Sequence, residues 1–170
     1  VPRALALLHV RSALRQLCRE SHLWTDEIGP LTLYANVGER EFPRPDGTEV
    51  ARVIGASYQG ASLPRRSAAQ MRAVDPDWQT QTGVALSAVV PGYRSVRLYP
   101  IPETTLDDPL YLTVELVPSQ TATQCADELL EYADGIAAGA LARLKRMANK
   151  PWSDRQAVRE YEDEYHAAIG

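Results

Sequence analysis

The feature that most constrains the fold is a pair of amphipathic segments at the end of the chain, joined by a short connector. Between positions 126 and 147, apolar residues recur at steps of three and four, as they do on one face of an α-helix. The first row consists of Leu129, Ala133, Ile136, Ala140, Leu144 and Met147. A parallel row, Leu130, Ala137 and Leu141, widens the stripe. A stripe of this width predicts a helix that packs into a globular core.

A second helix is predicted from Ser153 to Ile169. Ser153 and Gln156 have the spacing of a capping box, and Trp152, just before them, can pack back on Ala157. The inner face of this helix is predicted to carry Val158, Tyr161, Tyr165, Ala168 and Ile169. The connector at 148–152 contains a proline and is short, so we expect the two helices to be antiparallel neighbours.

Two glycines, Gly135 and Gly139, lie four residues apart in the first of these helices. Each costs roughly 1 kcal/mol of helix stability relative to alanine, which indicates that a partner approaches closely on that flank. Packing within the chain is the favoured interpretation. A contact between subunits remains the alternative, because this spacing is weak evidence in a helix outside a membrane.

A further helix is predicted from Pro2 to about His22. Its inner face is expected to carry Leu7, Val10, Leu14, Leu17, Cys18 and Ser21. The opposite face carries Arg3, Arg11, Arg15 and Arg19 at spacings of eight and four. Such a face is usually solvated, and the sharper alternative is a contact with an acidic partner.

The middle of the chain changes to the period of two that is typical of strands. Strands are predicted at 31–36, 50–54, 84–90, 95–99 and 110–117, with a short helix near 67–74 and a type II turn at Val90–Tyr93. Because the strands are grouped, we predict an α+β fold with a mainly antiparallel β domain. The N-terminal helix and the C-terminal hairpin should pack as a small bundle over 1–26 and 119–170, with the β domain inserted over 27–118.

Composition and motifs do not indicate an enzyme. The net charge of -4 argues against a protein that mainly holds nucleic acid through a basic surface. Gly55–Gly60 is one residue out of register with the GxSxG motif and is interpreted as a loop between strands. The cysteines and histidines show no metal-binding spacing. We therefore predict no catalytic residue, no cofactor, no metal and no membrane span.

The region 142–159 has the outline of a helix-turn-helix, with basic side chains that could contact phosphates. Four acidic residues follow at once: Glu160, Glu162, Asp163 and Glu164. They would repel a DNA backbone, so the reading of a DNA sequence by this region is not expected.

Short motifs spread along the chain resemble a known family. They are Arg97-Leu98-Tyr99-Pro100 with Pro102, then Leu116–Ser119, then Gly139–Leu144 running on to Lys150-Pro151-Trp152-Ser153. Together with a first helix that closes on Leu17–Glu20 and a following Trp24, they resemble the head-to-tail adaptor proteins of tailed bacteriophages, of the type of tail tubular protein A. The resemblance extends over almost the whole chain.

The resemblance implies a virion structural protein that is assembled in the host cytoplasm and resides at the head–tail junction. Such proteins form a ring, a dodecamer in short-tailed phages, beneath the portal protein. The ring joins the portal to the tail nozzle or tube and leaves a channel for double-stranded DNA. The alternatives are a stopper or tail-terminator ring protein, or a small ligand-binding or enzymatic α+β domain whose site is formed by tertiary contacts.

A ring subunit needs two unlike lateral surfaces that fit each other. The residues expected at a subunit or portal interface are Arg11, Arg15, Gly135, Gly139, Arg143, Arg146, Lys150 and Trp152. The acidic residues Glu160, Glu162, Asp163 and Glu164 are expected to face the channel, where their charge would keep DNA from sticking. A solvated helix face is the plainer interpretation of the same four residues.

Overall fold

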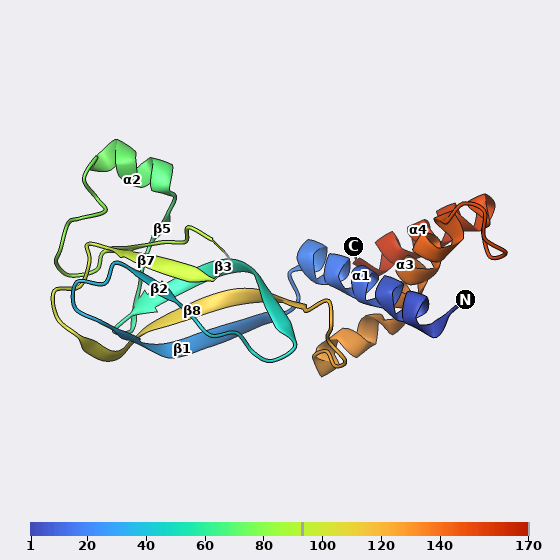
Figure 1. Cartoon of the computed structure of the whole chain (residues 1–170), viewed down its shortest axis with the longest axis horizontal. Helices are drawn as coiled ribbons and strands as arrows, with labels where there is room; N and C mark the ends of the chain where they lie inside the picture. Colours follow the sequence, from blue (N-terminus) through green and yellow to red (C-terminus); the bar gives the residue numbers. More distant parts are fainter. Residues whose placement is uncertain (93, 170) are drawn as a thin grey trace. The chain divides into compact units, whose positions relative to one another are not determined.

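The computed structural model describes residues 1–92 and 94–169, and the side chain of Asp108 also lies outside the description. The helices are α1 (Arg3–Ser21), α2 (Ala68–Val74), the 3-10 helix η1 (Asp127–Tyr132), α3 (Ala133–Arg146) and α4 (Arg155–Ile169). The strands are β1 (Thr25–Leu33), β2 (Glu39–Glu41), β3 (Thr48–Tyr58), β4 (Ala61–Ser62), β5 (Arg65–Arg66), β6 (Ser87–Val89), β7 (Ser95–Tyr99) and β8 (Leu106–Pro118). This order confirms the predicted α+β class (Figure 1).

In the described part of the chain, the strands form two four-stranded sheets. The first has the order β1-β8-β3-β4 and the second has the order β2-β7-β6-β5. The pairs β1–β8, β3–β4, β2–β7 and β6–β7 are antiparallel, whereas β5 and β6 are parallel. The prediction of a mainly antiparallel β domain is therefore confirmed.

The strand β8 shows the predicted alternation. Leu110, Leu112 and Val114 are completely buried, whereas Thr113 points to solvent. Glu115 lies on the same side as Thr113 but is buried, because it accepts hydrogen bonds from Arg52 Nε at 3.2 Å and Nη2 at 2.7 Å. This pairing is what allows a carboxylate to be buried in a central strand.

The short helix predicted near 67–74 is confirmed as α2. The Ser67 hydroxyl accepts from the Gln70 amide and the Gln70 side chain accepts from the Ser67 amide, which completes a capping box. Met71 on this helix packs with Trp78 and Val89 in a buried cluster of the β domain. The turn predicted at Val90–Tyr93 includes Tyr93, which lies outside the described residues.

The chain divides into two compact units. A helical unit comprises Val1–Trp24, Asp46–Glu49 and Leu116–Gly170, and a β unit comprises Thr25–Pro45 and Val50–Glu115. The helical unit thus includes residues 46–49 and 116–118, which our sequence-based boundaries assigned to the β domain. Polar contacts within the helical unit account for this grouping, because Arg15 on α1 donates to both Pro118 O and Glu49 Oε2.

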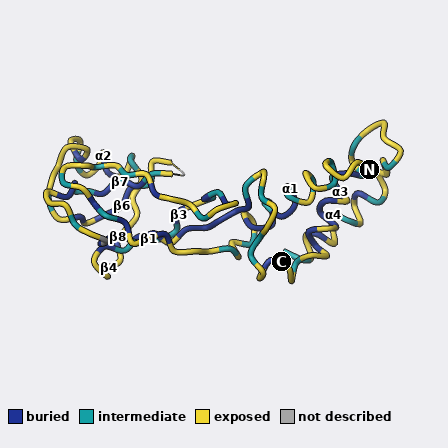
Figure 2. The backbone as a smooth tube through the Cα atoms, turned by 60° about the horizontal axis from the view of Figure 1, so that its bottom comes forward, coloured by how far each residue is buried: buried dark blue, intermediate teal, exposed yellow. Residues whose placement is uncertain are grey.

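The helical unit is a three-helix bundle in which α3 packs against both α1 and α4. Gly135 near the start of α3 meets Ala168 near the end of α4, so these two helices are antiparallel as predicted. Tyr165 of α4 lies against Gly139 of α3 and also reaches Ala13 of α1. The N terminus lies at the same end of this unit as the α3–α4 connector (Figures 1 and 2).

The prediction for the buried face of α3 was partly wrong. Ile136, Ala140 and Leu144 are buried, but Leu130 and Leu141 are 61% and 37% exposed, and Ala137 is exposed too. The bundle instead buries the small-residue flank, which consists of Gly135, Ala138, Gly139 and Ala142. Both α1 and α4 approach this flank, so the buried face turns away from the outer row of leucines. The first turns, predicted as α-helix, form the 3-10 helix η1.

The predicted cap of α4 was wrong by one residue. Asp154, and not Ser153, accepts hydrogen bonds from the amides of Gln156 and Ala157, both at 3.2 Å. The Ser153 hydroxyl instead donates to Met147 O and accepts from the Lys150 amide. It therefore closes the connector between the helices and does not start the second one.

Three further predictions require correction. Leu7 and Val10 of α1 are exposed and do not belong to its buried face, which consists of Ala13, Leu14, Leu17 and Cys18. The strand predicted at 31–36 is β1, which begins at Thr25 and ends at Leu33, before the left-handed residue Asn36. Residues Gly55–Tyr58 belong to β3 and are not a loop. None of the described helices is long and apolar enough to cross a membrane.

Candidate functional site

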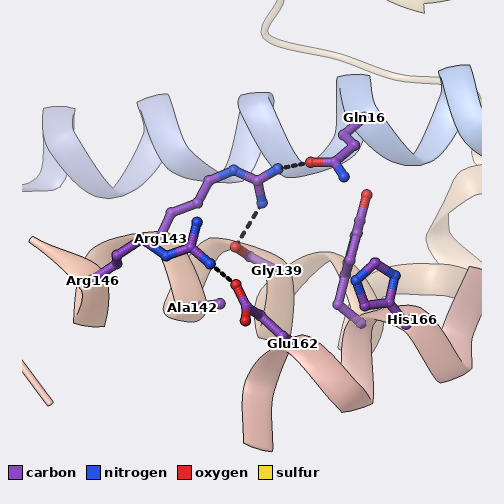
Figure 3. A pocket seen from close by; sticks show the side chains of 8 residues that line it. Gln16, Gly139, Ala142, Arg143, Arg146, Glu162 and His166 are labelled. Carbon is purple, nitrogen blue, oxygen red and sulfur yellow. Dashed lines mark hydrogen bonds and ion pairs between the residues drawn. The ribbon is translucent and has the colours of Figure 1, made fainter. Parts of the chain in front are cut away.

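A cleft with a volume of about 230 Å³ lies where the three helices of the bundle meet (Figure 3). Its walls are formed by Gln16 of α1, by Gly139, Ala142, Arg143 and Arg146 of α3, and by Glu162, Tyr165 and His166 of α4. Among the described residues, no group of three or more His, Cys, Asp or Glu side chains is placed to hold a metal ion. The contacts between helices that the structure shows in the cleft include a hydrogen bond from Arg143 to Gln16 and an ion pair between Arg146 and Glu162.

Arg143 contacts all three helices of the bundle. Its Nη1 donates to Gly139 O at 2.7 Å, and its Nη2 donates to Gln16 Oε1 (Figure 3). The guanidinium also lies 5.9 Å from the centre of the Tyr165 ring, within the range of a cation–π contact. This predicted interface residue thus already has partners on α1, α3 and α4.

Arg146 forms an ion pair with Glu162 from α3 to α4, at the rim of the cleft. Their side chains are 65% and 36% exposed, so solvent screens the pair and it should contribute between 0 and about 1 kcal/mol. Glu162 lies on a different side of α4 from Glu160, Asp163 and Glu164, and on this side it meets α3.

Tyr165 is buried at the centre of the bundle, and its hydroxyl donates to Ala13 O at 3.2 Å. Burial, followed by the nearby charge of Glu20, raises the pKa of Tyr165 from 10.0 to about 12. Burial likewise raises the pKa of the Cys18 thiol from 9.0 to about 11. Both shifts mean that the folded bundle holds these groups in their neutral forms.

We expect the bundle to lose stability in alkali. Because both folded-state pKa values are raised, the stability that the two groups contribute is fully present below pH 9.0. The contribution of Cys18 is lost as the pH rises from 9.0 to about 11. The contribution of Tyr165 is lost as the pH rises from 10.0 to about 12. The measurement is the free energy of unfolding in urea from pH 8 to 12. Tyr165→Phe should cost about 1 kcal/mol at pH 8 through its lost hydrogen bond and should flatten the upper part of this decline. An identical decline in the variant would contradict the assignment to Tyr165.

The glycine flank of α3 finds its close partner within the chain. A Cβ atom on Gly135 would lie 2.4 Å from Ala168 Cβ, and one on Gly139 would lie 2.6 Å from Tyr165 Cδ2. Neither position has room for a side chain. The close approach that the sequence predicted is thus made by α4, in agreement with the favoured interpretation of packing within the chain.

Comparison with models of protein families matches residues 2–170 to the SU10 adaptor protein family. The chain belongs to this family. It is therefore a phage adaptor protein, a structural component of the virion. A search of curated proteins found no match.

The remaining cationic residues of the predicted interface divide into two kinds in this adaptor protein. Arg11 Nε donates to Ala122 O at 2.8 Å, so it holds α1 against the segment that follows β8. Arg15 donates to Pro118 O at the end of β8 and to Glu49 Oε2 near the start of β3. Lys150, on the α3–α4 connector, is exposed. Trp152 is half-buried, and its indole N–H is enclosed without a hydrogen-bond partner among the described residues.

The acidic residues of α4 are separated by the structure of this adaptor protein. Glu160, Asp163 and Glu164 lie on the exposed side of the helix, whereas Glu162 is paired with Arg146. Three of the four predicted channel residues therefore share one solvent-facing surface.

One surface feature of the adaptor escaped the sequence analysis. A groove of about 530 Å³ follows α1, and its walls are formed by Gln120 and by Leu8, Arg11, Ser12, Arg15, Gln16, Arg19 and Glu20 of α1. The arginine spacing indicated a charged face. The groove itself depends on Gln120, which is far from α1 in the sequence, and no local pattern could have revealed it.

Proposed function

We propose that this adaptor forms a ring beneath the portal protein, at the head–tail junction of the virion. The ring joins the portal to the tail nozzle or tube and lines the channel through which double-stranded DNA passes. The subunits assemble in the host cytoplasm, as a dodecamer if the adaptor follows the tail tubular protein A type. The family match over residues 2–170 is the observation that carries this proposal.

The polar contacts of the helical unit support a role in assembly. Three arginines of the predicted interface make their polar contacts within the unit: Arg15, Arg143 and Arg146. Such contacts make a bundle that holds its shape, which a ring subunit requires because each subunit must present the same two surfaces to its neighbours. The proposed role is accordingly structural and non-enzymatic.

The exposed acidic surface of α4, formed by Glu160, Asp163 and Glu164, is proposed to face the channel. Fixed negative charge there repels the phosphate backbone and prevents DNA from adhering as it passes. The α3–α4 connector, which carries Lys150 and Trp152, is proposed as the portal contact. Lys150 is exposed, so a partner protein can reach its side chain.

The proposal is tested by mixing the purified chain with the purified portal protein of the same phage and measuring the mass of the complex. We expect a complex whose added mass corresponds to a closed ring, about twelve copies if the dodecameric arrangement of tail tubular protein A-type adaptors applies. The chain alone serves as the control, since assembly can depend on the portal. A chain that never associates with the portal, or a particle that assembles normally without it, would contradict the proposal. A particle reconstruction with the α4 carboxylates on the outer wall would contradict the channel assignment alone.

A further inference from the structure

The groove along α1 presents positive charge around an exposed leucine. Three of its side chains are arginines, Arg11, Arg15 and Arg19, one is the acidic Glu20, and Leu8 is 52% exposed. Arg11 and Arg15 are held in place by their bonds to Ala122 O and Pro118 O, and Arg15 is also paired with Glu49, so Arg11 and Arg19 supply most of the charge that is left for a partner. A docking partner would not need to order the long side chains of Arg11 and Arg15, which is an entropic cost of most charged interfaces.

The outer face of η1 and the first turn of α3 presents the opposite charge around another exposed leucine. Leu130 is 61% exposed. It is surrounded in the sequence by four exposed carboxylates, Asp127, Glu128, Glu131 and Asp134. Among the described residues, no ion pair commits any of these four to a cation of the same chain. We call this surface the η1 acidic face.

We propose that the η1 acidic face of one copy docks into the α1 groove of the next copy around the ring. This inference rests on the proposed ring. A closed ring needs two different surfaces on each subunit that complement each other. The α1 groove and the η1 acidic face match in both respects, leucine against leucine and carboxylates against arginines, and complementary charge also suppresses wrong pairings.

The glycine flank of α3 is already filled within the chain, so the contact with a neighbouring subunit must use other surfaces. Sequence analysis had pointed to Gly135 and Gly139 as one candidate, but α4 of the same chain fills that flank. The side of η1 and α3 that remains open carries Leu130, Ala137 and Leu141. The open side of the helix, and not its glycine side, is therefore the one that can meet a neighbour.

The test reverses the charge of each surface and then of both. The groove variant is Ser12→Glu with Arg19→Glu, and the acidic-face variant is Glu128→Arg with Glu131→Arg. Arg19, Glu128 and Glu131 are exposed, and Ser12 is half-buried with its hydroxyl donating to Leu8 O of the same helix. Circular dichroism checks that each variant folds. Ring assembly is measured by mass photometry of the full chain with the purified portal protein, over a range of chain concentrations and at low salt.

We expect each variant to raise the concentration needed for assembly at least tenfold, because like charges then face each other. The chain that carries all four substitutions should assemble within about threefold of the unaltered chain, because the two surfaces are again opposite in charge. The matched controls are Arg44→Glu with Arg72→Glu and Glu41→Arg with Asp77→Arg, at exposed positions of the β unit, and they should change little.

Four outcomes would overturn the inference. If the unaltered chain assembles and the variants assemble equally well, the ring stands but its contact lies elsewhere. If the combined variant is not restored, or if the controls weaken assembly as much, the two surfaces do not meet. If the unaltered chain never assembles at any concentration with the portal, the proposed ring falls, and this contact falls with it.

Discussion

Gly139→Leu is expected to lower the free energy of unfolding of the helical unit by about 3 kcal/mol, the upper end of the usual cost of overpacking a core. Even a bare Cβ at this position would lie 2.6 Å from Tyr165 Cδ2 and 3.2 Å from Ala13 Cβ. Leucine adds three further carbons where α1, α3 and α4 meet. The gain in helix propensity, about 1 kcal/mol, offsets only part of the strain.

The measurement is urea unfolding followed by far-ultraviolet circular dichroism, which reports mainly on the helices. Ala137→Leu is the matched control, since it introduces the same side chain two positions away on the exposed side of α3. It should change the free energy of unfolding by no more than about 0.5 kcal/mol. Equal midpoints for the two variants would show that α4 does not pack on α3 as described.

Arg15→Met is expected to cost about 2 kcal/mol of stability, because two hydrogen bonds that involve a charged group are lost. The Arg15 side chain is only 12% exposed, and it donates to Pro118 O and to Glu49 Oε2, the latter at 2.8 Å. Methionine keeps most of the apolar stem, so the loss reports on the polar contacts and not on packing.

Arg19→Met is the control for this prediction, one helical turn further along α1 and exposed. It should leave the midpoint of urea unfolding unchanged within about 0.5 kcal/mol. A loss of stability in Arg19→Met as large as that in Arg15→Met would mean that helix propensity, and not the bonds to residues 49 and 118, is responsible. If Arg15→Met is as stable as the unaltered chain, Arg15 is free for a partner, as the sequence had suggested.

Both predictions concern residues that the sequence placed at an interface and that the structure uses inside the bundle. The sequence placed Arg15, Arg143 and Gly139 among the candidate interface residues. The sequence could not say whether the partner was a neighbouring element or a neighbouring subunit, because both kinds of contact require the same residue types at these positions. Where a helix of the same chain already makes that contact, as α4 does at Gly139, the residue contributes to the shape of the subunit.

The residues of the candidate site could be predicted from the sequence, but which of them share one surface could be predicted only in part. Glu160, Asp163 and Glu164 do share an exposed side of α4, as helical spacing requires. Glu162 does not join them, because the same spacing puts it on another side of α4, and there Arg146 of α3 pairs with it. Helical spacing separates Glu162 from the other three, but only the pairing of the two helices decides that its charge is cancelled.

The sequence by itself determined the elements that follow from local geometry: α1, the antiparallel pair α3 and α4, the short helix α2 and the buried alternation of β8. These patterns repeat with the period of the backbone, so they can be read without knowing the neighbours. Only the tertiary structure decided which flank of α3 is buried, that Asp154 caps α4, and that a groove opens along α1 beside Gln120. The physical reason is that a helix with apolar rows on two sides buries the side that another helix can approach most closely. Because Gly135 and Gly139 carry no side chains, the neighbouring helices approach most closely on their side of α3, and this side is the one that is buried.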